Sequence, residues 1–245
     1  MSGHSHAKTV KRVKDANDAR RGKIFSKMAR LISIAAKEGG DSETNSKLKQ
    51  AIEVAKNVNT PKENIERAIK KGTGELEGDI LEEVCYEVLG PGGVSIIING
   101  ITDNKNRTLL EVKQALQKYN FKLAGEGSVK WAFDQKGIVT VKIQYDDRTD
   151  NEESLELLAI ESGAVDIQTR EYEKEKYMEI ITKPEELEQV KQDIANQGVN
   201  IDSTSLDWIA KEKIEIDEKL TETCEKLFLD LDDNDAVQAI YSNLK

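Results

Sequence analysis

A row of long basic side chains stands near the start of the chain at the spacing of a helix. Arg20, Lys23, Lys27 and Arg30 follow one another at intervals of three, four and three residues, so at about 100° per residue they fall within one quarter of a helical wheel. Such a row can follow a phosphate backbone, where displaced counterions supply affinity that depends little on base sequence. The alternative is that these cations only keep the wet face of an amphipathic helix soluble.

The surroundings of this row favour binding over simple solubility. More basic residues come just before it with no acid among them, and acids that would form i,i+4 pairs with the row are almost absent. Uncompensated basic stripes are typical of nucleic-acid-binding surfaces. Two later lysines suit the negative end of a helix dipole, and they also widen the basic surface. The predicted nucleic-acid-binding residues are Lys8, Lys11, Arg12, Lys14, Arg20, Arg21, Lys23, Lys27, Arg30, Lys70 and Lys71.

The charge of the whole protein divides just beyond this region. Residues 1–75 hold seventeen Lys or Arg against nine Asp or Glu, a net charge of +8. The other 170 residues carry a net charge of −18, which accounts for the overall charge of −10. We therefore expect a cationic N-terminal part that contacts a polyanion, and an anionic remainder that contacts protein or avoids non-specific adsorption.

Composition limits the classes of protein to consider. Charged residues make up 33% of the chain and hydrophobic ones 38%, which predicts several small cores under an extensive surface. No apolar run approaches the ~20 residues of a membrane span, and the N-terminus does not resemble a secretory signal. We expect a cytoplasmic protein without a membrane partner. Cys85 and Cys224 stand far apart without a C-x-x-C motif, so we expect no disulfide, metal site or cofactor and predict both side chains to be buried.

The basic row lies on the first of three predicted helices. Ile24, Met28, Leu31, Ile32 and Ala35 form the apolar side of that helix. A second helix is expected at about 44–58. The third begins at Thr60-Pro61-Lys62-Glu63, which has the pattern of a capping box with proline at the first helical position, and it ends at Gly72. These helices predict a small, independent three-helix bundle within residues 1–78.

An α/β segment follows the bundle. Strands are expected at Glu83–Leu89 and Val94–Thr102, a helix at Asn104–Tyr119 and a strand at Ser128–Phe133. The intervening Gly90-Pro91-Gly92-Gly93 lacks the Gly-Lys-Ser/Thr of a phosphate-binding P-loop, so it is predicted to be a hairpin turn.

This segment also contains capping residues, two cations and two aromatic residues that could have a structural or a functional role. Thr102-Asp103-Asn104 supplies capping oxygens to the helix, and Lys105 and Arg107 oppose the dipole in its first turn. These two cations should have a partner, either an acid within the fold or an external anion. Trp131 and Phe133 are predicted to be core residues rather than base-stacking platforms.

Residues 135–205 are expected to form a unit of their own. Periodicity predicts the order strand, helix, strand, strand, helix, strand, which is the ferredoxin-like arrangement. Strands near Leu206–Ile209, Lys213–Ile216 and Ala236–Tyr241 and a helix at 217–231 then complete the sheet begun at Glu83. The predicted fold class is α+β and multidomain, a three-helix bundle followed by two ferredoxin-like α/β domains. Residues 135–205 form the domain inserted into the other, which comprises residues 79–134 and 206–245.

Six segments of the chain form a characteristic set, namely Met1–Ser5, Arg21–Lys27, Pro61–Ile69, Gly90–Val94, Thr102–Thr108 and Gly127–Phe133. Together they resemble the YebC/PmpR family, which includes the mitochondrial translational activator of cytochrome oxidase. The resemblance implies three domains with the third set into the second, a cytoplasmic location and a role in gene expression, either as DNA-binding transcription regulators or as ribosome-associated elongation factors. This chain has His6-Ala7 where the family usually has Lys-Trp.

The sequence is compatible with three functions. The first is a nucleic-acid-binding regulator that contacts DNA or ribosomal RNA, with ribosome or transcription-machinery proteins as further partners. The second is an enzyme, which is disfavoured because the chain holds only two histidines, His4 and His6, and no nucleophile elbow, H-E-x-x-H or Walker sequence. The acid pairs Asp146-Asp147 and Asp232-Asp233 could hold Mg²⁺, but adjacent carboxylates near turns are usually solvated. The third is a protein adaptor that ignores the basic face.

Overall fold

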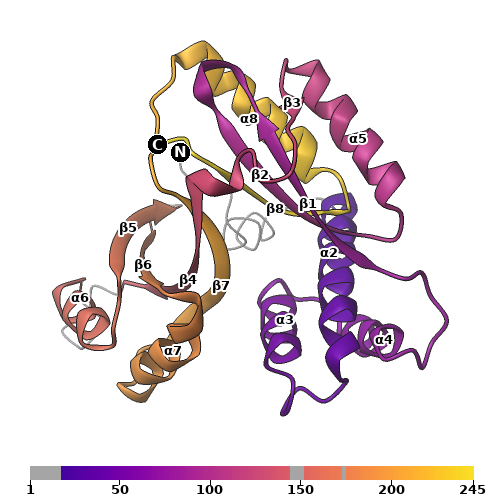
Figure 1. Cartoon of the computed structure of the whole chain (residues 1–245). Helices are drawn as coiled ribbons and strands as arrows, with labels where there is room; N and C mark the ends of the chain where they lie inside the picture. Colours follow the sequence, from indigo (N-terminus) through magenta and orange to yellow (C-terminus); the bar gives the residue numbers. More distant parts are fainter. Residues whose placement is uncertain (1–17, 144–151, 173–174) are drawn as a thin grey trace. The chain divides into compact units, whose positions relative to one another are not determined.

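The computed structural model describes residues 18–143, 152–172 and 175–245, with the backbone alone at residues 18–20 and 172 (Figure 1). The chain forms two compact units. The second unit is Asp134–Ile209, and the first unit contains the chain on either side of it. The second unit is therefore inserted into the first along the sequence.

Three helices open the described part of the first unit. They are α2 (Asp18–Ala35), α3 (Ser46–Asn57) and α4 (Lys62–Gly72), and α3 and α4 both pack against α2 (Figure 1). Their shared core includes Met28, Ile32, Leu48 and Ile65. The contact between α2 and α4 is tight at Gly72, where an added Cβ would lie 2.4 Å from the carbonyl oxygen of Ser33. These helices lie in the same compact unit as the first sheet, and their independence as a bundle stays a prediction.

Side-chain caps define the starts of these helices only in part. The Asn45 side chain accepts a hydrogen bond from the Leu48 N–H at 3.0 Å and donates to two carbonyl groups at the end of the preceding segment. The predicted capping box at Thr60 is wrong. Pro61 is the N-cap of α4, no side chain caps it, and the buried Thr60 hydroxyl has no hydrogen-bond partner in the described structure.

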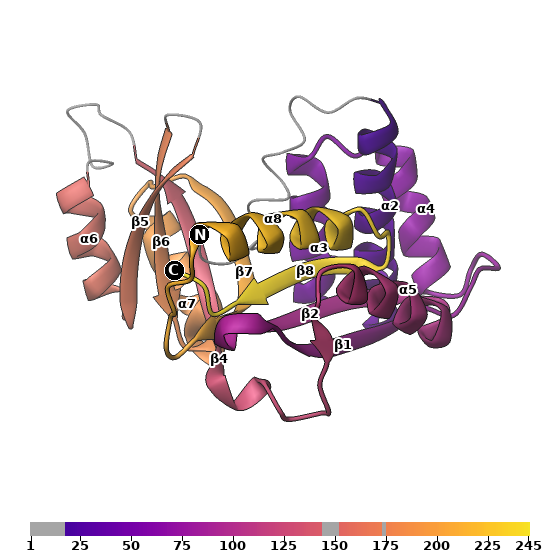
Figure 2. The ribbon, with the colours of Figure 1, turned by 90° about the horizontal axis from the view of Figure 1, so that it is seen from above.

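The first unit also contains a four-stranded antiparallel sheet in the order β3-β1-β2-β8. Its strands are β1 (Glu82–Leu89), β2 (Ser95–Thr102), β3 (Lys122–Leu123) and β8 (Val237–Ser242). The predicted hairpin at Gly90–Gly93 joins β1 to β2. Helices α5 (Lys105–Lys118) and α8 (Glu218–Asp232) lie side by side on one face of the sheet (Figure 2).

The second unit has the predicted element order. It consists of β4 (Phe133–Lys142), α6 (Glu152–Glu161), β5 (Asp166–Tyr172), β6 (Glu175–Thr182), α7 (Leu187–Asn196) and β7 (Ile201–Ala210). The strands form a sheet in the order β5-β6-β4-β7. Apolar side chains of α6 and α7, such as Leu155 and Ile194, pack with Val139 and Met178 of the sheet.

The first sheet departs from the prediction. Its elements follow the order β1, β2, α5, β3, α8, β8, so a hairpin precedes the first helix and the order is not the ferredoxin-like one predicted for this domain. The strand predicted at Leu206–Ile209 is part of β7. Lys213–Ile216 contributes only an isolated bridge between Ile214 and Leu244.

The predicted strand Ser128–Phe133 is also wrong, and a buried carboxylate explains why. The Glu87 carboxylate accepts hydrogen bonds from the backbone N–H groups of Gly127 (2.6 Å), Val129 (2.5 Å) and Lys130 (2.9 Å). These donors are therefore unavailable to a neighbouring strand. Lys130–Ala132 instead forms one turn of 3-10 helix, and β4 begins at Phe133.

Candidate nucleic-acid interface

The predicted binding residues fall into three groups in the structure. Lys8, Lys11, Arg12 and Lys14 lie outside the described residues, as does the side chain of Arg20. Arg21, Lys70 and Lys71 are exposed. The remaining three, Lys23, Lys27 and Arg30, face other elements of the first unit.

Lys27 contradicts the prediction that the basic face of α2 is open. This residue is only 3% exposed, and its Nζ donates to the carbonyl oxygen of Asp232 at 2.6 Å and to the carboxylate of Asp232 at 2.9 Å. Lys23 pairs in the same way with Asp233. Because these acids end α8, the two ammonium groups lie at the negative end of its dipole. The acid pair predicted as solvated or metal-binding therefore holds two lysines.

Arg30 completes this internal joint. Its Nη1 donates to the carbonyl oxygen of Ile101 at 3.0 Å and lies 3.8 Å from the carboxylate of Asp103. The row on α2 therefore connects the helix to β2 and α8. A helical wheel separates polar from apolar positions, but it does not distinguish water from the carboxylates of a distant segment. Nucleic-acid binding by Lys23, Lys27 and Arg30 stays a prediction, and a ligand would compete with these contacts.

An open cationic surface adjoins this joint and shares Arg30 and Asp103 with it. A cleft of about 480 Å³ lies between α2 and α4, and we call it the α2–α4 cleft. Four cations line it against two carboxylates. Its lining is Gly22, Phe25, Ser26, Ala29, Arg30, Ser33 and Lys37 of the first helical segment, Asn64, Arg67, Ala68, Lys71 and Gly72 of α4, and Asp79, Leu81 and Asp103.

The α4 wall carries the accessible charge. Asn64, Arg67 and Lys71 are spaced by three and four residues, so they share one face of the helix. Arg67 and Lys71 are exposed and form no hydrogen bond or ion pair with any residue that the structure describes. Lys37 is only partly available to a ligand, since its Nζ already donates a hydrogen bond to the carbonyl oxygen of Leu81 at 2.5 Å. Arg67 and Lys71 are thus placed to bind an external anion.

The sequence-based prediction included Lys71 but missed Arg67, Asn64 and Lys37. The signal that could have identified them is the spacing of Asn64, Arg67 and Lys71 on a helix whose ends were predicted. Three of the segments that carried the family resemblance also meet in this cleft, because Arg21–Lys27, Pro61–Ile69 and Thr102–Thr108 each contribute lining residues.

The two cations at the start of α5 have partners inside the fold. Lys105 lies 2.6 Å from the carboxylate of Glu82, and Arg107 lies 2.6 Å from that of Asp103. The Asn104 side chain caps the helix as predicted by accepting from the Arg107 N–H at 3.0 Å. Of the two predicted partners, the internal acid is therefore the observed one.

Two side chains predicted to be buried are exposed. Trp131 is 72% exposed, and its indole N–H donates to the carbonyl oxygen of Ser128 at 2.8 Å. Cys85 is exposed on β1, whereas Cys224 and Phe133 are buried as predicted. The turn held by Glu87 accounts for Trp131, because the strand alternation used to place it inside does not exist there.

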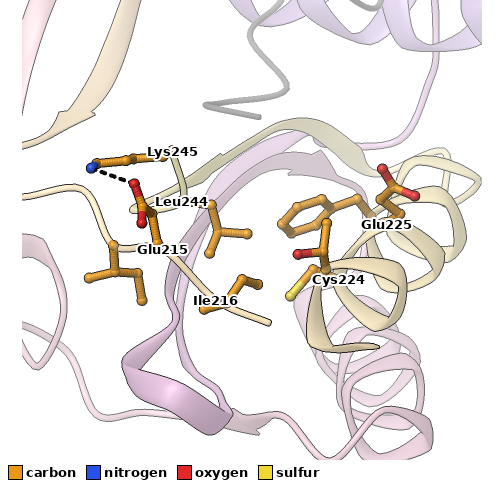
Figure 3. A pocket seen from close by; sticks show the side chains of 9 residues that line it. Glu215, Ile216, Cys224, Glu225, Leu244 and Lys245 are labelled. Atoms are coloured by element: carbon orange, nitrogen blue, oxygen red, sulfur yellow. Dashed lines mark hydrogen bonds and ion pairs between the residues drawn. The ribbon is translucent and has the colours of Figure 1, made fainter. Parts of the chain in front are cut away.

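A second, apolar cavity of about 240 Å³ lies beside the C-terminus (Figure 3). Ile214, Ile216 and Leu244 line it together with Cys224, and Glu215 pairs with Lys245 at 2.8 Å beside it. Burial raises the pKa of Cys224 to about 11. This thiol is therefore protonated near neutral pH and is a poor nucleophile.

Within residues 18–143, 152–172 and 175–245, no group of three or more His, Cys, Asp or Glu side chains is placed to hold a metal ion. Asp146 and Asp147 lie outside the described residues. Over the same ranges, no helix is both long enough and apolar enough to cross a membrane.

Comparisons with known proteins cover nearly the whole chain. The family model described as "TACO1/YebC protein N-terminal domain" matches residues 5–75, and the one described as "TACO1/YebC second and third domain" matches residues 81–244. A probable transcriptional regulatory protein of Syntrophus aciditrophicus is 44% identical over 245 residues, covering 99% of this chain and 95% of that protein.

Another protein with the same descriptive name, from Caldanaerobacter subterraneus, is 45% identical to this chain, and the match covers 100% of this chain and 98% of that protein. The crystal structure of a conserved hypothetical protein of Aquifex aeolicus is similar with a TM-score of 0.83 and 41% identity, covering 93% of this chain and 91% of that one. With both family models matched and relatives of this identity over the full length, the chain belongs to the TACO1/YebC family.

Proposed function

We propose that this protein is a non-enzymatic, cytoplasmic regulator of gene expression that binds nucleic acid through the cationic surface of its helical part. The observation that carries the proposal is that Arg67 and Lys71 line the α2–α4 cleft and pair with no residue that the structure describes. The charge division supports it, because a net +8 in residues 1–75 accompanies a net −18 elsewhere. The names of the curated relatives point to regulation of transcription.

Two nucleic acids are candidates. A DNA-binding transcriptional regulator comes first because curated relatives carry that descriptive name. A ribosome-associated factor that binds RNA and assists elongation is the second candidate. Lys23, Lys27 and Arg30 contact other elements of the first unit, so they do not form an exposed row to lie along a duplex groove. The remaining cations border a hollow, which suits RNA recognised by shape and by its unpaired bases.

Salt-dependent binding of the full chain tests the proposal. Affinity for a labelled DNA duplex and for a structured RNA is measured by fluorescence anisotropy across a range of salt concentrations. Polyanion binding predicts a fall in log affinity with log salt of about 0.9 per phosphate contact on duplex DNA and about 0.7 on single strands.

The variant Arg67→Gln/Lys71→Gln should bind both probes more weakly and with a shallower salt slope. The matched control is Lys113→Gln/Lys122→Gln, which removes two exposed charges outside the helical part and should bind like the unmodified chain. A chain that binds neither probe at low salt, or a slope of zero, would contradict the proposal and favour a protein adaptor.

A further inference from the structure

We infer that the α2–α4 cleft takes one unpaired nucleotide, with its base against Phe25 and its phosphate beside Arg67 and Lys71. The inference rests on the proposed function and names the part of a nucleic acid that this site binds. It is carried by a glycine without a packing role, by the division of the lining into a charged and an aromatic part, and by the size of the cleft.

Gly22 is the most informative residue of the lining. It stands within α2, where glycine lowers helix stability by roughly 1 kcal/mol relative to alanine. Packing against the described residues does not explain it, because a Cβ added at this position would meet none of their atoms within 4 Å beyond its chain neighbours and the backbone of its own helix. Gly72 differs, since its Cβ would collide with α2. A helical glycine that borders open space beside a cleft is expected where a ligand approaches the backbone closely.

The charged part of the cleft suits a phosphate. Arg67 and Lys71 are one helical turn apart and have no partner among the described residues, so their donors are available to an anion. The negative charge of Asp103 is already offset by Arg107 at 2.6 Å and Arg30 at 3.8 Å. The electrostatic balance of the hollow is therefore positive.

The opposite wall suits a base. Phe25 presents a half-buried aromatic ring to the cleft, and stacking of a base on such a ring tolerates any sequence. Ser26 and Asn64 line the same hollow, and their side chains form no hydrogen bond within the described structure. A hydroxyl and an amide can both donate and accept, which is what the edge of an unpaired base requires.

The size of the cleft distinguishes a nucleotide from a bare anion. Its volume of about 480 Å³ falls within the roughly 300–1,000 Å³ of small-molecule sites. A phosphate bound by surface lysines requires no hollow, and a duplex keeps its bases stacked inside. An unpaired nucleotide uses both the charged and the aromatic part at once.

The experiment compares four labelled oligonucleotides with the full chain at one low salt concentration. They are a single-stranded RNA, a DNA strand of the same sequence and the blunt duplex of each. The inference predicts tighter binding of the single strands than of their duplexes, and the ratio of RNA to DNA affinity identifies the sugar that the site prefers.

Two variants test the cleft without adding or removing charge. Gly22→Leu places a side chain beside the hollow, and it should weaken single-strand binding at least tenfold while leaving the melting temperature equal or higher, since leucine favours helix. Phe25→Leu keeps an apolar side chain but removes the ring, and a loss of roughly 5- to 150-fold is expected from ~1–3 kcal/mol of stacking. The control Lys49→Gln/Lys56→Gln removes two exposed charges of α3 and should change affinity less than either variant.

The outcomes separate the inference from the proposed function. If the unmodified chain binds nucleic acid and Gly22→Leu binds equally well, the nucleotide cleft is refuted while the proposed function stands. If both variants lose duplex and single-strand binding to the same extent, the cleft recognises phosphate alone and the base assignment is overturned. If no oligonucleotide binds the unmodified chain at low salt, the proposed function fails and the inference fails with it.

Discussion

The joint between Lys27 and Asp232 predicts an unequal response to removing either partner. Lys27→Met replaces a buried ammonium with an apolar side chain of similar length. It leaves the Asp232 carboxylate, which is 34% exposed, accessible to water. The cost is then the loss of two charge-assisted hydrogen bonds, at 2.6 and 2.9 Å, or about 2 kcal/mol.

Asp232→Asn removes the other partner and should destabilise the fold more than Lys27→Met does. It leaves Lys27, a residue that is only 3% exposed, without its counter-charge, and an uncompensated buried charge of this kind costs about 3–5 kcal/mol of stability. The backbone carbonyl and the new amide oxygen can both still accept from the ammonium, so we expect a value near the lower end of that range. The double variant Lys27→Met/Asp232→Asn removes the stranded ammonium, and it should return to about the 2 kcal/mol of Lys27→Met alone.

Thermal unfolding of the full chain measures these effects. For a unit of this size, 1 kcal/mol corresponds to roughly 2–4 °C, so Lys27→Met should lower the melting temperature by about 4–8 °C and Asp232→Asn by more. Hydrogen exchange in α2 peptides assigns the loss to the first unit. A double variant less stable than both single variants would refute the reasoning, since independent contacts would then add. Lys27→Met should also bind nucleic acid nearly as well as the unmodified chain, in contrast to the prediction from its helical position.

Three further outcomes follow from single contacts. Gly72→Ala forces α2 and α4 apart, because the new Cβ would lie 2.4 Å from a backbone oxygen; a loss of about 1–3 kcal/mol in urea unfolding is expected. Burial raises the pKa of Glu87, but hydrogen bonds from three backbone N–H groups lower it by more, so its pKa lies below the ordinary value. Its stabilisation is present above about pH 4.3 and is lost as the pH falls through the lowered pKa, and Glu87→Gln should flatten that part of the stability profile. Mass spectrometry after brief iodoacetamide treatment should find Cys85 alkylated well before the buried Cys224.

Local signals predicted much of the element order. The glycine-rich turn between β1 and β2, the Asn104 cap and the order of the second unit depend on residues close together in sequence. The exposure of Trp131 could not be predicted in the same way. Its exposure depends on the Glu87 carboxylate, which captures N–H groups about forty residues later. Nothing in the alternation of apolar residues indicates that those donors are already used.

The candidate site shows the same limit more sharply. Charge and spacing placed a cationic surface on the first helices, yet they could not divide its cations by role. Lys27 and Arg30 have the same helical spacing as free cations, but acceptors from α8 and β2 take their hydrogen bonds. Arg67 and Lys71 gave the weaker sequence signal and remain unpaired in the described structure.

The cations of the N-terminal helices are divided between internal contacts and an open cleft, and this division connects folding to binding. If the α2 row were also free, the first unit would concentrate uncompensated positive charge in one region, and self-repulsion would weaken its fold. Two adjacent acids at the end of α8 offset the charge of two lysines in this row, and these ion pairs attach α2 to α8. This attachment fixes one wall of the α2–α4 cleft, while Gly72 brings α4 close enough to form the other. The contacts that withdraw Lys27 from solvent therefore position the cleft in which Arg67 and Lys71 remain available to a ligand.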